Sequence, residues 1–212
     1  MTATTVHSFL ATLGEQFSQW SGYELLAVMM AIGYLLLAIR QNIWCWLCAG
    51  ISTAIYIVIF FQAKLYMESL LNGFYLLMAI YGWQIWRNAA GELEDLPVTV
   101  WPWRTHFFAI AFIAALSMSS GYLLDEFTDA AFPYVDSATT FAAVWATFLV
   151  ARKVLENWWY WLVIDLVSIL IYWSRDLQLT SVLFATYVVL IPFGLAAWTR
   201  SYQKTQQTMA MA

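Results

Sequence analysis

The chain is poor in charged residues, proline, cysteine and histidine. Of its 212 residues 10% are Asp, Glu, Lys or Arg and 63% are hydrophobic, with 4 Pro, 2 Cys and 2 His. Soluble domains carry about 25% charged residues, so this composition excludes an ordinary soluble enzyme. It is typical of a protein whose solvent is mostly lipid, and we expect one membrane domain over residues 1–212.

Sequence motifs of catalysis and metal binding are also missing. The chain has no G-x-S-x-G, no H-E-x-x-H and no phosphate-binding loop, and His7 and His106 lie far apart. Cys45 and Cys48 fall in an apolar stretch without further ligands, which argues against a zinc site. We therefore expect no enzymatic activity, no metal, no cofactor and no nucleic-acid partner.

The first residues lack the basic start of a cleaved signal peptide. No Lys or Arg occurs among residues 1–20, and apolar residues recur there every three or four positions, at Val6, Phe9, Leu10, Leu13, Phe17 and Trp20. This pattern predicts that residues 1–22 form a short amphipathic helix at the membrane interface.

Seven apolar windows are long enough to cross a bilayer, and Trp and Tyr crowd their ends as interfacial anchors do. The expected fold class is an all-α integral membrane protein with spans at Tyr23–Ile39, Ile43–Phe61, Tyr66–Trp86, His106–Leu124, Ser137–Ala151, Trp158–Trp173 and Leu179–Trp198.

Basic residues fall mainly on one side of this topology. The segments on the side of the C-terminal tail (199–212) hold seven Lys and Arg, whereas those on the side of the N-terminus hold two. Because basic loops stay in the cytoplasm, we expect the N-terminus outside and the C-terminus in the cytoplasm.

The two halves share landmarks at nearly constant spacing, which indicates an internal repeat. Adding 112 maps Arg40 onto Arg152, and Leu71, Tyr75, Gly82 and Trp86 onto Leu183, Tyr187, Gly194 and Trp198. Adding 115 maps Asn42, Trp44 and Trp46 onto Asn157, Trp159 and Trp161.

Each half therefore reads as three helices, over residues 23–86 and 137–198. Three spans reverse the chain direction, so the helix at 106–124 is needed to bring the second triplet back in the same orientation. We expect a 3+1+3 parallel pseudo-repeat, and a site between the two halves is a known arrangement in transporters.

One polar stripe runs along the sixth span. Its members follow steps of three and four, which place them on one helix face: Trp158, Trp161, Asp165, Ser168 and Tyr172. We call this set the Asp165 stripe. A carboxylate about 10–12 Å from either end of the span costs about 2.5 kcal/mol or more unless it faces protein or water.

The third span carries a matching stripe of Glu68, Asn72, Tyr75, Ala79 and Gly82, while Tyr187 stands opposite Tyr75 in the repeat. Asn72 lies too deep to be a helix cap and offers both donor and acceptor. Glu68 is alternatively a solvated side chain beside Lys64. The two stripes favour a site for a small cationic aromatic molecule, through stacking, cation–π contact and hydrogen bonds. The competing interpretation is a polar seam that joins helices.

Two long segments resemble the PnuC family of vitamin transporters. They are ENWWYWLVIDLVSILIYW with the following LQLTSVLFATYVVL, and FQAKLYMESLLNGFYLLMAIYGWQIW. The family's W-x-x-W-x-x-x-[N/D] signature falls on Trp158, Trp161 and Asp165. The resemblance implies a 3+1+3 fold like full-length SWEET sugar facilitators, a homotrimer, and uptake of nicotinamide riboside across the bacterial inner membrane by facilitated diffusion, with trapping by a cytosolic kinase.

Two departures affect the expected substrate. Nicotinamide riboside carriers of the family have Asn in place of Asp165 and Gln in place of Asn72, and thiamine carriers share the fold. We expect Trp158 and Trp161 to stack on the substrate, Asp165 to hold its charge or hydroxyls, and Asn72, Tyr75, Ser168, Tyr172 and Tyr187 to complete the site. The alternatives are thiamine as substrate and a scaffold protein without substrate.

Overall fold

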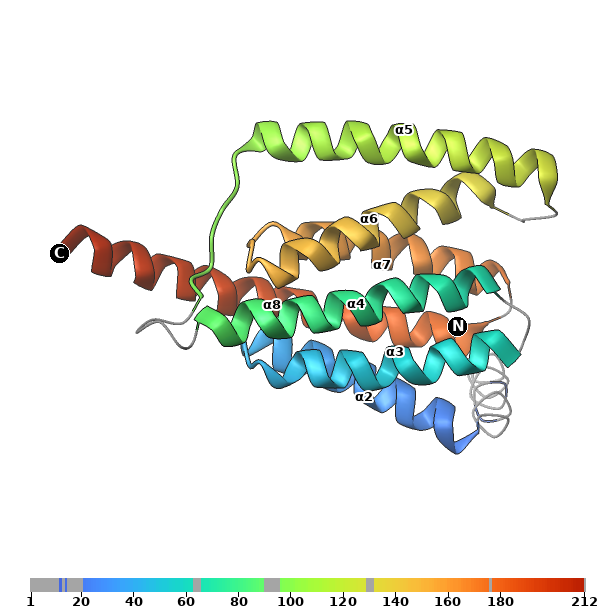
Figure 1. Cartoon of the computed structure of the whole chain (residues 1–212), viewed down its shortest axis with the longest axis horizontal. Helices are drawn as coiled ribbons and strands as arrows, with labels where there is room; N and C mark the ends of the chain where they lie inside the picture. The colour runs from blue at the N-terminus through green and yellow to red at the C-terminus, as the bar shows by residue number, and fades with distance from the viewer. Residues whose placement is uncertain are drawn as a thin grey trace, which may run out of the picture. The chain divides into compact units, whose positions relative to one another are not determined.

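The chain folds into α-helices in its described part. The computed structural model describes residues 12, 14, 21–62, 66–89, 96–128, 132–175 and 177–211, apart from the side chains of 66–68 and 89. Within these residues seven helices follow in order (Figure 1): α2 (Gly22–Ile39), α3 (Trp44–Gln62), α4 (Tyr66–Ala89), α5 (Trp103–Phe127), α6 (Pro133–Ala151), α7 (Asn157–Ser174) and α8 (Gln178–Met211).

Each predicted span corresponds to one of these helices, with ends that differ by a few residues. The largest difference is at α8, which continues through the expected tail as a helix of 34 residues. The expected amphipathic helix at 1–22 falls almost wholly outside the described residues.

Five of the described helices, α2, α3, α5, α6 and α8, are long and apolar enough to cross a membrane. The other two, α4 and α7, are those that carry the predicted polar stripes. Asn, Gln and Arg in α4, and Asp165 with Asn157 in α7, lower the apolarity of these helices. That α4 and α7 also span the membrane stays a prediction.

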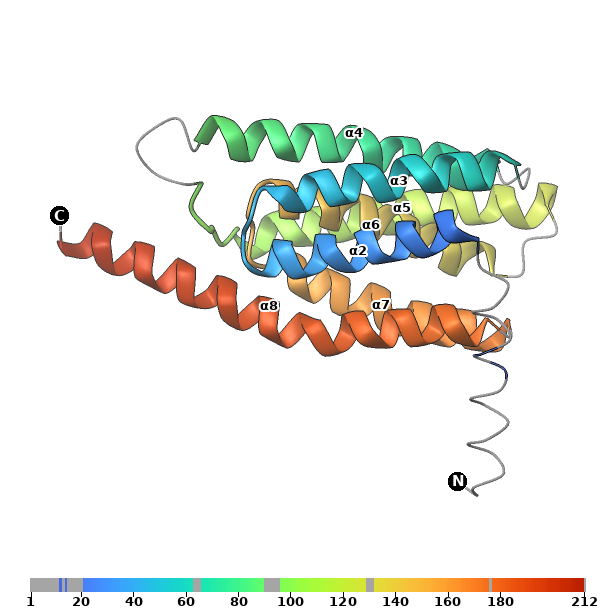
Figure 2. The same ribbon diagram turned by 90° about the horizontal axis from the view of Figure 1, so that it is seen from below.

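The chain divides into two compact units, and α4, α7 and α8 each contribute residues to both. The first unit holds residues 1–80 and 165–190. In it α2 and α3 pack side by side (Figures 1 and 2), and the buried Ser52 hydroxyl of α3 donates a 2.8 Å hydrogen bond to the Ala27 carbonyl of α2. Ser21 and Glu24 form a capping box that begins α2.

Two further serine bonds in this unit occur at equivalent positions of the repeat. Ser69 of α4 donates to the Ile57 carbonyl of α3 at 3.0 Å, and 112 positions later Ser181 of α8 donates to the Ile169 carbonyl of α7 at 3.1 Å. Because a serine between helices in lipid has no water to bond, such bonds fix the local helix register.

The turns between α2 and α3 and between α6 and α7 also correspond. Gln41 and Lys153 both have positive φ, 54° and 49°. The amide of Asn42 bonds the Leu37 carbonyl at 2.9 Å, and the amide of Val154 bonds the Leu149 carbonyl at 2.9 Å. These recurrences agree with the internal repeat predicted from the sequence.

The spacing of 112 continues past this turn, which corrects the expected match of 115. The amide of Cys45 bonds the Asn42 carbonyl as the amide of Asn157 bonds the Val154 carbonyl. At the same spacing Trp46 corresponds to Trp158, and Thr53 corresponds to Asp165, whereas a spacing of 115 would pair Asp165 with Gly50. The aromatic landmarks chosen for the match of 115 lie one helical turn out of register.

The second unit holds residues 81–164 and 191–212. In it α5 packs beside α6, where the buried Gly121 admits the ring and backbone of Tyr134 (Figure 1). The segment before α5, residues 96–101, is extended and pairs with the α6–α7 turn. Thr99 donates its N–H to the Lys153 carbonyl at 3.0 Å and accepts from the Leu155 amide at 2.8 Å. We call residues 96–101 the linker segment.

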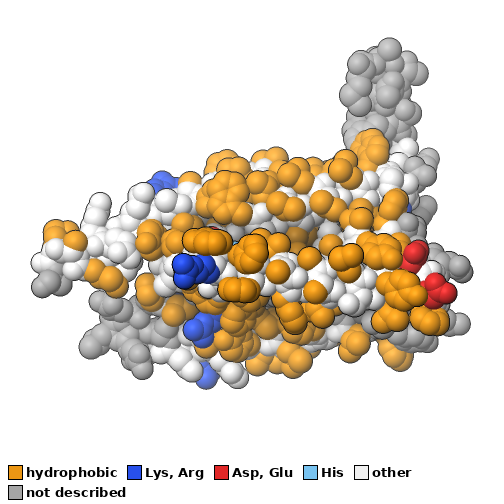
Figure 3. Space-filling model, turned by 90° about the horizontal axis from the view of Figure 1, so that it is seen from above, with side chains coloured by type: hydrophobic (Ala, Val, Ile, Leu, Met, Phe, Trp, Pro, Cys, Tyr) orange, Lys and Arg blue, Asp and Glu red, His pale blue; other side chains and the backbone are white. Residues whose placement is uncertain are grey.

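The outward side chains of α5 are largely apolar. The face shown in Figure 3 is covered mainly by hydrophobic side chains, with Lys and Arg toward one end and Asp and Glu at the other. Exposed apolar residues of α5 include Phe107, Phe108, Ile110, Phe112, Met118, Tyr122 and Leu123. A soluble protein rarely exposes so continuous an apolar surface, which suits contact with lipid.

Gly194 of α8 provides the space for a tryptophan in the second unit. Trp158 is 2% exposed, and its ring lies where any side chain at Gly194 would have to be. The same indole meets Trp198 edge-to-face, with ring centroids 5.5 Å apart and an interplanar angle of 90°. The glycine thus permits close approach of α7 and α8.

We predict that Gly194→Ala lowers the thermal stability of the purified protein. Overpacking of this kind costs about 1–3 kcal/mol, a shift of several degrees in the melting temperature. Gly73→Ala is the matched control, because a Cβ there meets nothing within 4 Å. Melting followed by size-exclusion chromatography in detergent tests this, and equal melting temperatures for the two variants would contradict the packing role.

Candidate functional site

The inward face of α7 carries the Asp165 stripe. Asp165 is 3% exposed and Ser168 7% exposed, while Trp161 and Tyr172 are half-buried. The opposite face of the helix is exposed and apolar, at Val163, Leu166 and Leu170. The periodicity predicted from the sequence therefore separates a buried polar face from an exposed apolar one.

Asp165 and Ser168 are buried, and within the described part of the chain neither side chain has a hydrogen-bond or salt-bridge partner. Among the described residues no Lys, Arg or hydrogen-bond donor is paired with the Asp165 carboxylate, and the Ser168 hydroxyl forms no hydrogen bond. The hydroxyl of a serine or threonine in a helix commonly donates to the carbonyl four residues earlier, as Thr147 of α6 does to Ala143 at 2.7 Å. Since buried polar groups are rarely left unpaired, these two point to a ligand.

Tyrosines of neighbouring helices lie close to this pair in the first unit. Tyr187 of α8 lies within electrostatic range of Asp165, and Tyr75 of α4 lies within the same range of Tyr172. Asn72 lies one turn before Tyr75 and is half-buried, with a partner of its own. The structure thus brings Asn72, Tyr75, Asp165, Ser168, Tyr172 and Tyr187 into one unit. The Glu68 side chain lies outside the description.

Two further tyrosines, in the first helices, were not predicted from the sequence. Tyr56 of α3 lies within electrostatic range of Tyr172 and Tyr187, and Tyr34 of α2 lies within the same range of Tyr75. The corrected repeat would have revealed Tyr56, because at a spacing of 112 it corresponds to Ser168. Five tyrosines from five helices thus form one group, to which Asp165 is linked through Tyr187.

Phe184 adds an aromatic wall to this cluster. Its ring stacks on Tyr172, with centroids 5.3 Å apart and planes inclined by 14°. It meets Tyr187 edge-to-face, with centroids 5.7 Å apart. Such ring contacts hold both tyrosine rings in place.

The two tryptophans of the stripe belong to the second unit. Trp161 precedes Asp165 by one helical turn and retains exposed ring surface. Trp158 is packed against Gly194 and Trp198, but its buried indole N–H has no acceptor among the described residues. Trp161 therefore has ring surface available for stacking, and Trp158 has an indole N–H available for a hydrogen bond.

The chemistry of the first unit suits binding without reaction. One carboxylate, one serine hydroxyl and several phenols can hold a cation or hydroxyls, but they provide no nucleophile with a paired base. In the described part of the chain no three His, Cys, Asp or Glu residues come together as a metal site would require.

Comparison with known proteins agrees with this chemistry. Residues 21–200 match the model of the nicotinamide mononucleotide transporter family. The nicotinamide riboside transporter PnuC of Escherichia coli K12 is 24% identical over 92% of this chain and 91% of its own. The riboflavin/roseoflavin transporter RibM of Streptomyces davaonensis is 22% identical over 88% and 87%.

The fold also has a counterpart among solved structures. The crystal structure of the vitamin B3 transporter PnuC superimposes with a TM-score of 0.70 at 22% identity, over 96% of this chain and 94% of that one. The family and the relatives are transporters and not enzymes, which confirms the prediction that the chain has no enzymatic activity. The chain belongs to the nicotinamide mononucleotide transporter family of membrane proteins.

Proposed function

We propose that this protein imports a cationic vitamin or vitamin precursor by facilitated diffusion, with nicotinamide riboside as the principal substrate. The observation that carries the proposal is the buried Asp165 carboxylate, which has no cationic partner among the described residues. A permanently charged aromatic substrate would supply that charge and stack on tyrosine and tryptophan rings.

Thiamine is the second candidate, because it too is a planar cation with a hydroxyl. The Asp in place of the Asn expected of nicotinamide riboside carriers favours a positively charged ligand of either kind. Riboflavin is carried by a relative, yet it is uncharged, so its hydroxyls can donate to Asp165 but bring no positive charge to offset that of the carboxylate. The carboxylate therefore favours the two cations over a flavin.

The transport route follows from the predicted topology. We propose seven spans in a 3+1+3 arrangement, with the N-terminus outside and the C-terminus in the cytoplasm of a bacterial inner membrane. The paired serine bonds and paired turns support the two triplets. Phosphorylation of the substrate by a cytosolic kinase would make uptake one-way. The homotrimer stays an expectation based on family resemblance.

We predict that calorimetry on the purified protein detects binding of nicotinamide riboside or thiamine but not of riboflavin. Ionic attraction to Asp165 and stacking on aromatic rings act together only for the cations. Binding of riboflavin alone would refute the assigned substrate class. Binding of none of the three, with no rise in melting temperature, would favour the scaffold alternative.

We predict that Asp165→Ala weakens binding of the cationic substrate at least about tenfold, since a charged hydrogen bond contributes about 1.5–3 kcal/mol. The melting temperature should not fall, because no partner among the described residues is left unpaired. Asp125→Ala at the exposed end of α5 is the control. Unchanged affinity would remove Asp165 from the binding site. A lower melting temperature with unchanged affinity would show that Asp165 joins helices instead.

We predict that Trp161→Ala weakens substrate binding about two- to tenfold, because an aromatic pair contributes about 0.5–1.5 kcal/mol. Trp159→Ala is a matched control on the same helix, since that ring is 55% exposed on the outward face. Calorimetric titration of both variants compares them, and equal affinities would remove Trp161 from the site.

A further inference from the structure

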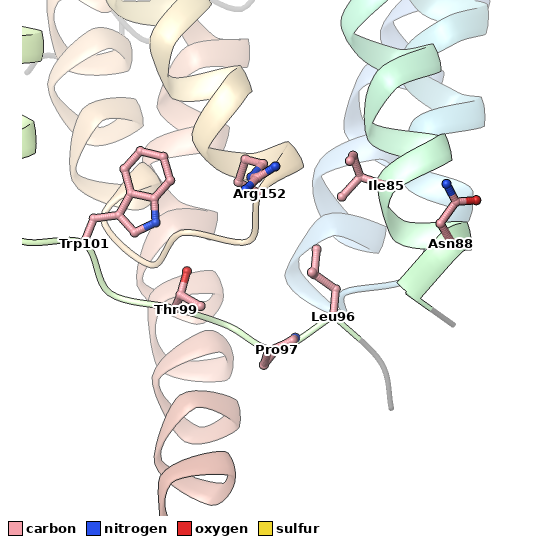
Figure 4. A pocket seen from close by; sticks show the side chains of 7 residues that line it. All are labelled: Ile85, Asn88, Leu96, Pro97, Thr99, Trp101 and Arg152. Carbon is pink, nitrogen blue, oxygen red and sulfur yellow. The ribbon is translucent and has the colours of Figure 1, made fainter. Parts of the chain in front are cut away.

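A cavity of about 390 Å³ lies in the second unit beside the linker segment. Its walls come from the end of α4, the linker segment and the end of α6 (Figure 4), at Ile85, Asn88, Leu96, Pro97, Thr99, Trp101 and Arg152. Figure 4 shows Arg152 between Trp101 on one side and Ile85 and Asn88 on the other. Cavities of this size hold small ligands or parts of larger ones.

Three polar side chains of the cavity have no protein partner in the described part of the chain. The Arg152 guanidinium has no ion pair or hydrogen bond, and neither the Thr99 hydroxyl nor the Asn88 amide is bonded. An arginine offers five N–H donors in a planar fork that matches the oxygens of phosphate. The cavity therefore presents donors that suit a tetrahedral anion.

The local charge is also positive among the described residues. Arg87 precedes Asn88, and the Lys153 ammonium lies 4.6 Å from the centroid of the Trp86 ring. The nearby acid, Glu156, is already engaged, because it accepts from the Trp101 amide at 3.4 Å and lies 3.9 Å from His106 Nε2. The acids of the segment 91–95 lie outside the described residues.

The remaining walls are apolar. Ile85, Leu96, Pro97 and the indole of Trp101 line the cavity beside the polar groups. A bare phosphate ion would leave these surfaces unused, whereas a phosphate attached to an apolar or aromatic group would contact them. The lining thus offers polar groups to one part of a ligand and apolar surface to another, which suits an amphipathic molecule.

We propose that this cavity binds the phosphate group of an amphipathic ligand, with Arg152 as its main anchor and Thr99 and Asn88 as further donors. Two sources share this chemistry: the headgroup of an anionic phospholipid, and a soluble aromatic phosphomonoester. The site is separate from the Asp165 stripe and does not depend on the vitamin proposed for it.

The internal repeat supplies a matched control. Arg40 is the counterpart of Arg152 at a spacing of 112, and both end their helices with nearly the same backbone, φ −82° and ψ 2° against φ −90° and ψ 5°. Arg40 is also exposed but lines no part of this cavity. Replacing either arginine removes one positive charge from an equivalent turn, and only Arg152→Gln alters the cavity.

The experiment compares wild type, Arg152→Gln and Arg40→Gln in detergent with two probes. Phenyl phosphate is titrated by calorimetry against phenol as the phosphate-free probe, and retention of phosphatidylglycerol over phosphatidylcholine is measured by native mass spectrometry. We expect Arg152→Gln to weaken binding of a phosphate probe at least about tenfold, Arg40→Gln to leave it unchanged, and Thr99→Val to weaken it about threefold.

Binding of phenyl phosphate alone assigns the site to a soluble phosphomonoester, and selective retention of phosphatidylglycerol alone assigns it to a lipid headgroup. Equal losses in Arg152→Gln and Arg40→Gln would overturn the proposal, because they indicate general attraction to positive charge. Absence of binding by both probes to wild type would overturn it as well. Titration of the vitamin on Arg152→Gln should give wild-type affinity and separates this site from the first.

Discussion

The fold depends on one constraint: inside a bilayer there is no water, so polar side chains between helices must form hydrogen bonds with other protein groups. In lipid, apolar side chains gain nothing from leaving the solvent, so helices associate through close packing and through polar groups that pair across them. Ser52, Ser69 and Ser181 use their hydroxyls in this way, and Gly121 and Gly194 allow close approach. Polar groups that do not join helices are then exceptions that need a reason.

Asp165 and Ser168 are such exceptions, and their position explains why the helix that carries them is less apolar than its neighbours. A helix that serves only as a membrane anchor has no use for a buried carboxylate, whereas a helix that lines a substrate path needs one only where the substrate is held. The stretch of α7 from Asp165 to Tyr172 lies within electrostatic range of tyrosines from α3, α4 and α8. Three of the buried polar residues thus join helices, whereas Asp165 and Ser168 do not.

The sequence predicted the helices well because lipid requires long apolar segments with aromatic ends, and these are visible without a structure. It also predicted the Asp165 stripe, since steps of three and four fix a helix face. It did not predict Tyr34 and Tyr56, because tyrosines in apolar helices resemble interfacial anchors. The match of 115 was wrong because abundant tryptophans gave a false register, whereas backbone hydrogen bonds of the turn give 112.

The cavity beside the linker segment could not be predicted from the sequence, for a different reason. It forms where the linker segment pairs with a turn more than fifty positions later along the chain, through Thr99 with Lys153 and Leu155. Such a contact between an extended segment and a turn uses backbone groups and produces no periodic pattern in the sequence from which it could be predicted. Arg152 in the sequence was simply one of the basic residues that set the topology.

The linker segment also makes two otherwise equivalent turns unequal. The α2–α3 and α6–α7 turns each contain a left-handed residue that is not glycine. Within the described part of the chain the α6–α7 turn is the one that pairs with an extended segment, through Thr99. Opening it requires two further backbone hydrogen bonds to break, so its local stability should exceed that of the α2–α3 turn.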